Sequence, residues 1–392
     1  MIDVVIASAA RTAIGSYGKG LAGVPPSDLG AIAAEAAIDR AAIEPAQVEH
    51  VVFGNVIHTE PGDAYMARVV GIKAGVPKEV PAYTVNRLCG TGVQAIVSAA
   101  QAIQTGEAEV ALAGGAESMS RGPYWMPGAR WGARMGEAKL IDPVMGALTD
   151  PFESILMGVT AENLAERGSI SRERQDEFAV RSHRRAAAAR AEGRFDGQIV
   201  GVPVKSRRET VSFERDEHIR EDASAEGMAN LKPVFKPDGT VTAGNASGMN
   251  DAAAAVVLMT AERAAALGAP VRARVLGYAS CGVEPSIMGI GPVPAVRRVL
   301  ERTGRKLEDI EVIELNEAFA AQALAVIDDL GLDEEKVNPN GGAIALGHPI
   351  AATGAAITAK ILDEMERRDA ELGLVTLCIG GGQGIAMLLG RE

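Results

Sequence analysis

Two cysteines lie in glycine-rich surroundings near opposite ends of the chain. Cys89 stands in the segment NRLCGTG and Cys378 in the segment LCIGGGQG. Glycines beside a cysteine let a ligand approach the backbone N–H groups closely, and a thiol in such a setting can act as a nucleophile or a proton carrier. His348, within GHP, adds a base, and Asn316, within NEAF, adds an amide. Together these residue types suggest a two-cysteine acyl-transfer enzyme.

Cys89 is expected at the start of a helix, because apolar residues recur at helical spacing from Val93 to Ile103. A helix N-terminus carries about half a positive charge and free N–H groups. These should lower the pKa of the thiol and bind a developing oxyanion. The alternative is a small buried apolar residue, which is the commonest fate of a free cysteine.

The other three candidates also have structural alternatives. His348 is a natural base for generating a thiolate, but its ring could equally be satisfied by local backbone in a tight turn. Cys378 closes a strand and could be a core residue, although Gly380 could offer its N–H to an oxyanion. Asn316 could be an N-cap, or it could hold a water or donate to a thioester oxygen. The remaining histidines lie in polar contexts and are expected at the surface: His50, His58, His183 and His218.

These parts fit one reaction. A thiolate attacks a thioester or β-keto thioester and forms an acyl-enzyme, and a second acid/base moves a proton at the α-carbon of the other acyl group. Each half-reaction places negative charge on an oxygen and needs its own donors, each worth about 3–4 kcal/mol.

The composition excludes several function classes. The chain of 392 residues should form two or more domains. A net charge of −12 argues against general binding of nucleic acid and against docking on an anionic membrane. Three scattered cysteines make neither a disulfide framework nor a zinc spacing, and we expect no metal. The chain starts as a strand and has no apolar run of about 20 residues, so a cytoplasmic location with reduced thiols is expected.

Strand-like runs alternate with alanine-rich helices along the chain. A helix is expected from about Ser27 or Asp28, one of which should be its N-cap, to Ile38. Residues 51–54 and 110–113 predict strands, whereas residues 252–259 fit either a helix start or a buried strand. From about residue 118 to 248 the regular alternation is lost, which indicates an inserted region that includes a capped helix at residues 171–178.

The last third of the chain resembles the first in outline. Residues 312–315 resemble the strand at 51–54, and a glycine-bearing turn with an alanine-rich helix follows in each. Each copy then reaches a buried strand that closes on glycines, at Gly114 and at Gly380. Two copies of one β/α unit, packed together, would bring their helix N-termini to a shared centre.

The four motifs NRLCGTG, NEAF, GHP and CIGGG, in this order and spacing, resemble those of the thiolase family from end to end. The resemblance implies an α/β protein with the five-layered αβαβα thiolase fold, made of two similar halves with an inserted loop domain over the site, assembled as a homotetramer. The N-terminal half would comprise residues 1–118 with 249–268, the loop domain residues 119–248, and the C-terminal half residues 269–392.

The resemblance also implies roles for residues. Cys89 is similar to the acylated nucleophile, His348 to its activator and Cys378 to the acid/base at the α-carbon. His348 with a water held by Asn316 would form one oxyanion site, and the N–H groups of Cys89 and Gly380 the other. Coenzyme A and acyl-CoA would be substrates, with no tightly bound cofactor. The implied contacts to them are Ser247 and Ala243 in the pantetheine-contacting segment, Arg220 near the nucleotide, and Met157, Phe235, Met288, Ala318 and Phe319 lining the tunnel.

Two positions depart from the family pattern. Leu156 stands where many members carry a histidine, which removes a polar contact to the substrate and shifts the expected preference toward other acyl chains. Ala351 stands where glycine is usual, and would be strained if that position needed a positive φ. The alternatives are a ketoacyl-synthase-type enzyme acting on carrier-protein substrates, which the second cysteine argues against, and a catalytically silent acyl-CoA binder.

Overall fold

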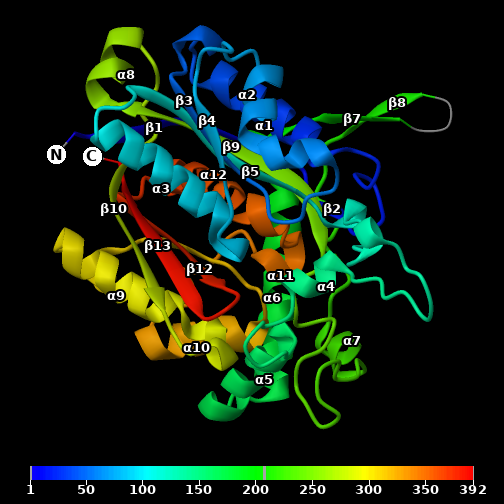
Figure 1. Cartoon of the computed structure of the whole chain (residues 1–392). Helices are drawn as coiled ribbons and strands as arrows, with labels where there is room; N and C mark the ends of the chain where they lie inside the picture. Colours follow the sequence, from blue (N-terminus) through cyan, green and yellow to red (C-terminus); the bar gives the residue numbers. More distant parts are fainter. Residues whose placement is uncertain (1, 206–208, 392) are drawn as a thin grey trace.

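A mixed β-sheet runs through the molecule and continues from its N-terminal half into its C-terminal half (Figure 1). The computed structural model describes residues 2–205 and 209–391. The principal strands of the described chain pair in the order β11-β12-β13-β10-β1-β9-β5-β3-β4, with the short strands β2 (Gly15–Ser16) and β6 (Ile199–Val200) at its margin. Their bounds are β1 Val4–Thr12, β3 His50–Gly54, β4 Ala82–Val85, β5 Val110–Ser118, β9 Asn250–Thr260, β10 Ala273–Gly282, β11 Val312–Leu315, β12 Leu372–Ile379 and β13 Gln383–Gly390.

The strand order contains the same unit twice. In β3-β5-β9-β1 the first pair is parallel and the next two are antiparallel. The series β11-β12-β13-β10 has the same directions. The two units join where β1 pairs antiparallel with β10, at Val5 opposite Arg274. The predicted repeat is therefore confirmed by the topology.

Helices form three layers around and between the two parts of the sheet, which gives the expected five-layered αβαβα fold (Figure 1). The central layer holds α3 (Thr91–Gln104) and α12 (Ile350–Arg368), which contact each other and strands of both halves. The outer layer of the first half contains α1 (Pro26–Arg40), α2 (Met66–Lys73) and α8 (Ala261–Leu267). The outer layer of the second half contains α9 (Pro292–Thr303) and α10 (Ala320–Leu330).

The central helices meet at their N-terminal turns because two glycines face each other there. A Cβ added at Gly92 would lie 2.5 Å from the backbone nitrogen of Ala355, and one at Gly354 would lie 2.3 Å from that of Val93. No side chain fits at such distances, so glycine permits the close approach. The two helix N-termini consequently lie at one centre, as the repeat predicts.

A long excursion lies between β5 and β9. It contains α4 (Pro143–Ala147), α5 (Met157–Gly168), α6 (Arg172–Ala191), α7 (Ala225–Ala229) and the hairpin of β7 (Val202–Lys205) and β8 (Thr210–Phe213). Helix α6 begins where expected, because the Ser171 hydroxyl accepts a hydrogen bond from Arg174 N–H at 3.2 Å. Between β5 and α4 the chain forms an extended arm with exposed side chains, among them Trp125 and Trp131.

Three expectations about local structure are settled by the fold. The ambiguous run at 252–259 is a strand, since β9 is buried and pairs with β1 on one side and β5 on the other. The predicted cap at Ser27 or Asp28 is wrong: α1 begins at Pro26, whose ring presets a helical φ, and Pro25 is its N-cap. His50 and His183 were expected at the surface but are buried.

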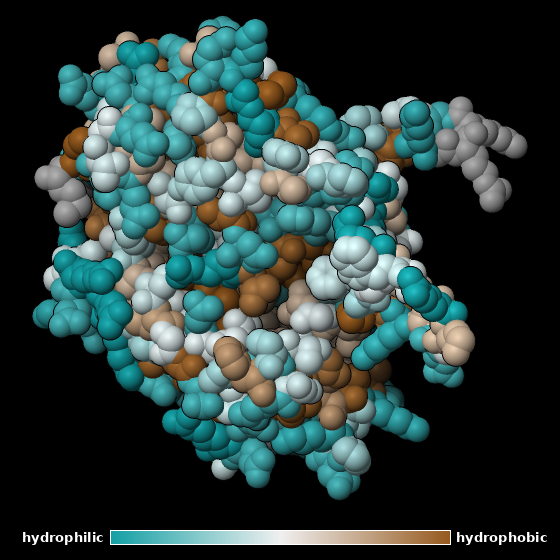
Figure 2. Space-filling model, viewed as in Figure 1, coloured by the Kyte–Doolittle hydropathy of each residue, from teal (hydrophilic) through white to brown (hydrophobic). Residues whose placement is uncertain are grey.

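No helix among the described residues combines the length and apolar character that crossing a membrane requires. On the face shown in Figure 2, polar side chains cover much of the outer helices. Apolar side chains reach the surface mainly along the middle of that face.

Candidate active site

The two candidate sulfurs come from the two halves and lie close together. Cys89 belongs to the short 3-10 helix η3 (Leu88–Gly90) directly before α3, and Cys378 lies near the end of β12. Gly90 packs so closely on Ile379 that an added Cβ would lie 2.5 Å from its side chain. Cys378 is fully buried, whereas Cys89 remains partly exposed.

Electrostatics show that the sulfurs interact. Burial raises the pKa of the Cys378 thiol well above its usual range, and negative charge on Cys89 raises it further. Two thiolates are therefore not stable side by side here, so the two sulfurs must lose their protons at different stages.

The resting Cys89 is a thiol, which corrects the expectation of a lowered pKa. Burial raises the pKa of Cys89 to about 11. Hydrogen bonds from the N–H groups of Gly380 and of Cys89 itself lower this pKa, but by less than burial raises it. The same two N–H groups were assigned to one oxyanion site, and the structure does aim both at the Cys89 sulfur. Cys89 consequently needs a base at the moment of attack.

His348 lies in the turn between the short helix α11 (Ala343–Leu346) and α12. Burial lowers the pKa of His348 to about 4, so the imidazole is neutral at physiological pH. Nδ1 lies 2.7 Å from the Thr353 hydroxyl, while Nε2 is buried without a partner among the described residues. The ring is therefore held by a side chain of α12 rather than by local backbone, and Nε2 can accept a proton when the Thr353 hydroxyl accepts the one on Nδ1.

Asn250 fixes the backbone at His348. Its Oδ1 accepts the His348 N–H at 2.9 Å, and its Nδ2 donates to the Gly15 carbonyl at 3.0 Å. Gly347 has φ 110°, and a Cβ there would lie 2.4 Å from Asn250 Cγ, so only glycine fits. Sequence reasoning missed Asn250 because nothing in a single sequence pairs residue 250 with residue 348. It also missed Thr353, although that residue stands only five positions after His348.

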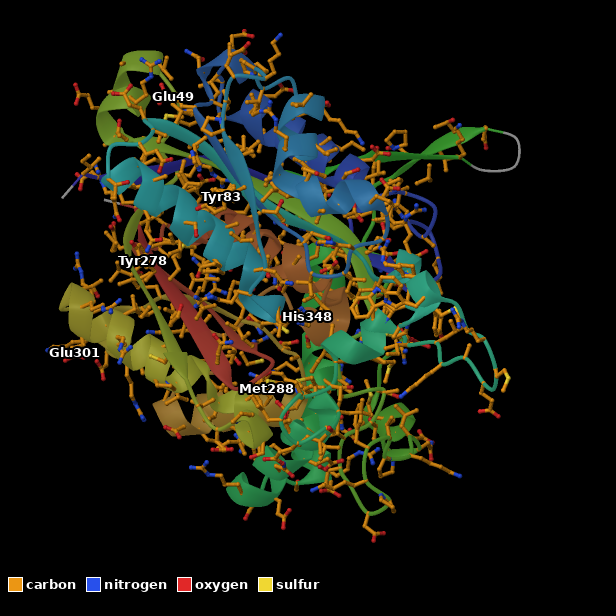
Figure 3. The ribbon with its side chains drawn as sticks, in the orientation of Figure 1. Glu49, Tyr83, Tyr278, Met288, Glu301 and His348 are labelled. Atoms are coloured by element: carbon orange, nitrogen blue, oxygen red, sulfur yellow. The ribbon has the colours of Figure 1, made fainter. Side chains whose placement is uncertain are left out.

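Figure 3 shows His348 near the middle of the molecule and Met288 below it, whereas Glu49 lies in its upper part and Glu301 at its left margin. Ile350, two residues after His348, packs in one apolar cluster with Ile57 and Met119, and Cys89 contacts the same cluster. The start of α12 also contacts η3. The nucleophile and the base therefore occupy the same region.

Asn316 follows β11 and does not cap a helix, because the N-cap of α10 is Phe319. Its N–H donates to the Thr376 carbonyl at 3.0 Å. Both its side-chain atoms, Oδ1 and Nδ2, are buried without partners in the described parts of the chain. Leaving a buried amide unpaired costs about 1–3 kcal/mol per group, so this side chain is suited to a bound water or ligand. Its role as a donor remains a prediction.

Most of the predicted substrate contacts line one apolar region next to Cys378. Met157, Met288 and Ala318 form a buried cluster with Cys378, and Phe319 packs against it. The Phe235 ring meets the Phe319 ring edge-on at 6.0 Å.

The segment that carries Ala243 and Ser247 runs beside this region. Ser247 N–H donates to the Ala318 carbonyl at 3.0 Å, and Ala243 is exposed. Leu156 is the N-cap residue of α5, adjacent to Met157. Arg220 lies apart from the cluster: it is exposed, in a groove that it shares with His218 and Met249.

Ala351 causes no strain, because it belongs to α12 and has no positive φ. Its N–H donates to Glu117 Oε2 at 3.1 Å. A groove of ≈ 660 Å³ along α6 contains none of the candidate catalytic residues, and two of its charged side chains, Arg190 and Glu221, pair with each other. Among the described residues, His, Cys, Asp and Glu side chains form no group of three suited to a metal ion.

Comparison with known proteins agrees with this geometry. The thiolase N-terminal domain model matches residues 4–262 and the thiolase C-terminal domain model residues 269–391. The chain is 57% identical to a beta-ketothiolase of Cupriavidus necator over 99% of both chains. It is 52% identical to an acetyl-CoA acetyltransferase of Pseudomonas aeruginosa over the whole of both.

Solved structures give the same answer. The crystal structure of a Bacillus anthracis acetyl-CoA acetyltransferase superposes with a TM-score of 0.97 at 48% identity and covers 100% of this chain and 99% of that one. A human mitochondrial 3-ketoacyl-CoA thiolase in complex with CoA gives a TM-score of 0.97 at 44% identity, with 100% and 98% coverage. The chain therefore belongs to the thiolase family of acyltransferases.

Proposed function

We propose that the protein is a β-ketothiolase that cleaves 3-ketoacyl-CoA with coenzyme A, or condenses two acyl-CoA molecules, through an acyl-Cys89 intermediate. The observation that carries the proposal is that the Cys89 and Cys378 sulfurs, from the two halves, lie close together and that the N–H groups of Cys89 and Gly380 are directed at the Cys89 sulfur. The unpartnered Nε2 of His348 supplies the neutral base that such a thiol needs.

In the cleavage direction, Cys89 transfers its proton to His348 Nε2 as its sulfur bonds to the keto carbon of the substrate. The bond between the α-carbon and that carbonyl carbon breaks, and Cys378 protonates the departing carbanion. Coenzyme A then gives its thiol proton to the Cys378 thiolate and attacks the acyl-Cys89 thioester. His348 returns its proton to Cys89, so every group regains its starting state.

Negative charge develops on an oxygen in both stages. The N–H groups of Cys89 and Gly380 would hold the oxyanion on the carbon bonded to Cys89, and their hydrogen bonds to the Cys89 sulfur support this assignment. His348 and a water held by Asn316 would stabilise the enolate oxygen of the other acyl group. The unpartnered side chain of Asn316 supports this assignment.

Acylation of Cys89 tests the proposal. Incubation with acetyl-CoA should add one acetyl group to Cys89, detected by intact mass and peptide mapping. Cys89→Ser should abolish the adduct, while Cys378→Ser should retain it and lose turnover. Cys281→Ser is the matched control, because Cys281 lies on β10 outside the site and should keep full activity. Acylation by acyl carrier protein but not by acyl-CoA would favour a ketoacyl synthase, and acyl-CoA binding with no adduct would favour a silent binder.

Substrate length is proposed to depend on Leu156. The apolar side chain replaces a polar contact beside Met157, so longer 3-ketoacyl-CoA substrates should be favoured over acetoacetyl-CoA. Leu156→His should shift the kcat/KM ratio toward acetoacetyl-CoA by about 10-fold, within the range that one pocket contact supplies. An unchanged ratio across a chain-length series would contradict this assignment.

We further propose a cytoplasmic homotetramer with the domain division given above, in which Arg220 binds the nucleotide end of coenzyme A. The three reduced cysteines support a reducing compartment. Two features support assembly. The edge strand β4 pairs with β3 alone among the described strands and exposes Tyr83, and the arm exposes a run of apolar side chains: Tyr124, Trp125, Trp131, Met135 and Leu140.

A further inference from the structure

Glu117 is a buried carboxyl group that the reaction above does not use. It lies near the end of β5 and is fully buried. Oε1 accepts hydrogen bonds from Asn55 Nδ2 at 3.1 Å and from Ile57 N–H at 3.0 Å. Oε2 accepts the N–H of Ala351 at 3.1 Å. Burying a carboxyl group costs free energy that its hydrogen bonds must offset. A buried carboxyl group with three such bonds is therefore expected to have a structural or functional role.

These partners come from the two halves of the molecule. Asn55 and Ile57 directly follow β3 in the first half, whereas Ala351 is the second residue of α12 in the second half. The first N–H groups of a helix lack partners within it, and the N-cap of α12, Pro349, provides no side-chain hydrogen bond. Glu117 therefore caps α12 from the other half of the molecule.

The capped turn is the one that carries the base. His348 stands two residues before α12, and its Nδ1 partner, Thr353, is the fourth residue of that helix. Ile57, whose N–H binds Glu117, and Ile350, the first residue of α12, belong to the apolar cluster that Cys89 contacts. Glu117 thus links the apolar cluster that packs against Cys89 to the first turn of α12, the helix that follows His348.

We propose that Glu117 is a positioning residue that fixes the start of α12, and with it His348, in position relative to Cys89. The inference rests on the function proposed above and deepens it. A displacement of about 1 Å between reacting groups can lower a rate on the order of 100-fold, so a fixed connection between the halves matters most at this turn.

The charge of Glu117 provides a second readout. Burial raises the pKa of Glu117 to about 8, hydrogen bonds from the N–H groups of Ile57, Ala351 and Val56 oppose the shift, and negative charge on Asp63 adds to it. Negative charge on Glu117 in turn raises the pKa of Cys89. Asp63 thus affects the pKa of Glu117, and Glu117 affects the pKa of Cys89. Removing the Glu117 carboxyl group should therefore make the Cys89 thiol easier to ionise above pH 8.

The test compares Glu117→Gln, Glu117→Asp and Glu364→Gln with the parent protein. Glu364 is a matched control: it is also buried, and lies near the other end of α12, where it binds Asn340 and arginines. Glu117→Gln should lower kcat on the order of 10- to 100-fold with KM changed by less than about 3-fold. Glu117→Asp, which keeps the charge but shortens the reach, should lose kcat similarly.

Alkylation of Cys89 by iodoacetamide, followed against pH, separates positioning from a general loss of stability. The pH midpoint should move downward in Glu117→Gln and stay in place in Glu117→Asp and Glu364→Gln. An unchanged kcat in Glu117→Gln, or an equal loss of kcat in Glu364→Gln, would overturn the proposal. Alkylation needs no CoA substrate, so a parent protein that is alkylated but never acylated would refute the proposed function separately.

Discussion

The hydrogen bond between Thr353 and His348 orients the imidazole ring and bears on which ring nitrogen can act as a base. A neutral imidazole has one N–H and one free nitrogen, and the group bound to one nitrogen selects the state of the other. When the Thr353 hydroxyl accepts the proton on Nδ1, the free lone pair falls on Nε2, the nitrogen without a partner among the described residues. The raised pKa of Cys89 makes this selection important, because the thiol cannot ionise unaided near pH 7.

Thr353→Val should therefore impair the base without removing it. We expect kcat to fall about 10- to 100-fold, part of the roughly 100- to 10,000-fold that a general base contributes. Thr358→Val is the matched control, since Thr358 is also buried in α12 and its hydroxyl donates to the Gly354 carbonyl of the same helix. Steady-state kinetics measure kcat for both variants. An equal loss of kcat in the two would show that the Thr353 hydroxyl has no special role in orienting His348.

For single residues, the sequence predicts the reactive side chains better than the residues that hydrogen-bond to them. Cys89, Cys378 and His348 are recognisable because each combines a reactive side chain with neighbouring glycines. Asn250 and Glu117 are not, because each makes its decisive hydrogen bond to a residue about a hundred or more positions away. The sign of the Cys89 pKa shift was also beyond reach, since local position suggests a helix N-terminus and only the fold shows the burial.

Among the secondary-structure elements, α12 makes buried polar contacts in its first turn, to Glu117, and further along its length, through Lys360. Its Lys360 lies in the interior, where Nζ contacts Glu314 Oε2 on β11 at 2.9 Å and the Gly341 carbonyl at 2.6 Å. Gly341 starts the glycine-rich turn that leads to His348. Burial raises the pKa of Glu314 to about 7, and the neighbouring Lys360 opposes that shift. The pair joins a helix, a strand and the turn before the base.

Lys360→Met should destabilise the protein by about 3–5 kcal/mol, because it leaves Glu314 buried without its cation. The pKa of Glu314 in the folded state should then rise further above the unfolded value. A raised folded pKa gives stability that is present below the unfolded pKa and lost as pH rises, so the penalty should be larger at pH 8 than at pH 5. Urea unfolding followed by far-UV circular dichroism measures it.

The double variant Lys360→Met with Glu314→Leu is the control for this prediction. Replacing a buried ion pair by apolar residues is often neutral, so most of the lost stability should return. A double variant as unstable as Lys360→Met alone would contradict the explanation and would point to packing of the lysine stem instead.

Element types were predictable where the period was helical, as for α3, or where a short β-branched and aromatic run ended in glycine, as for β3. Residues 252–259 were not, because a continuous apolar run has neither the helical nor the alternating period. The reason is visible in the fold: β9 is a central strand covered by helices on both faces, so both sets of its side chains are buried.

For the molecule as a whole, the active site exists only where two halves meet. Cys89 comes from one half and His348, Asn316 and Cys378 from the other, and β1 pairs with β10 to make the sheet continuous. The repeat made this arrangement predictable in outline, since duplicated β/α units bring equivalent helix ends together. The exposed arm was not predictable in this way, because it belongs to the excursion that has no counterpart in the second half.

The arm offers a direct measurement of assembly. Both tryptophans of the chain, Trp125 and Trp131, lie in it with exposed fractions of 56% and 80%. If the arm mediates contacts between subunits, these rings are buried in the assembly and exposed in the separated protein, while the sheets remain intact. Dilution below the dissociation constant should therefore shift tryptophan emission to longer wavelength with no change in far-UV circular dichroism.

Trp131→Ser should weaken assembly, detected as a lower mass by light scattering at a given concentration, because large aromatic side chains dominate interface energies. Arg130→Ser, beside it on the same arm, is the control for a loss of contact in general and should weaken assembly less. The outcome that contradicts the arm as an interface is an emission maximum typical of exposed tryptophan in the assembled protein, since any assembly would then have to form through β4 or other surfaces.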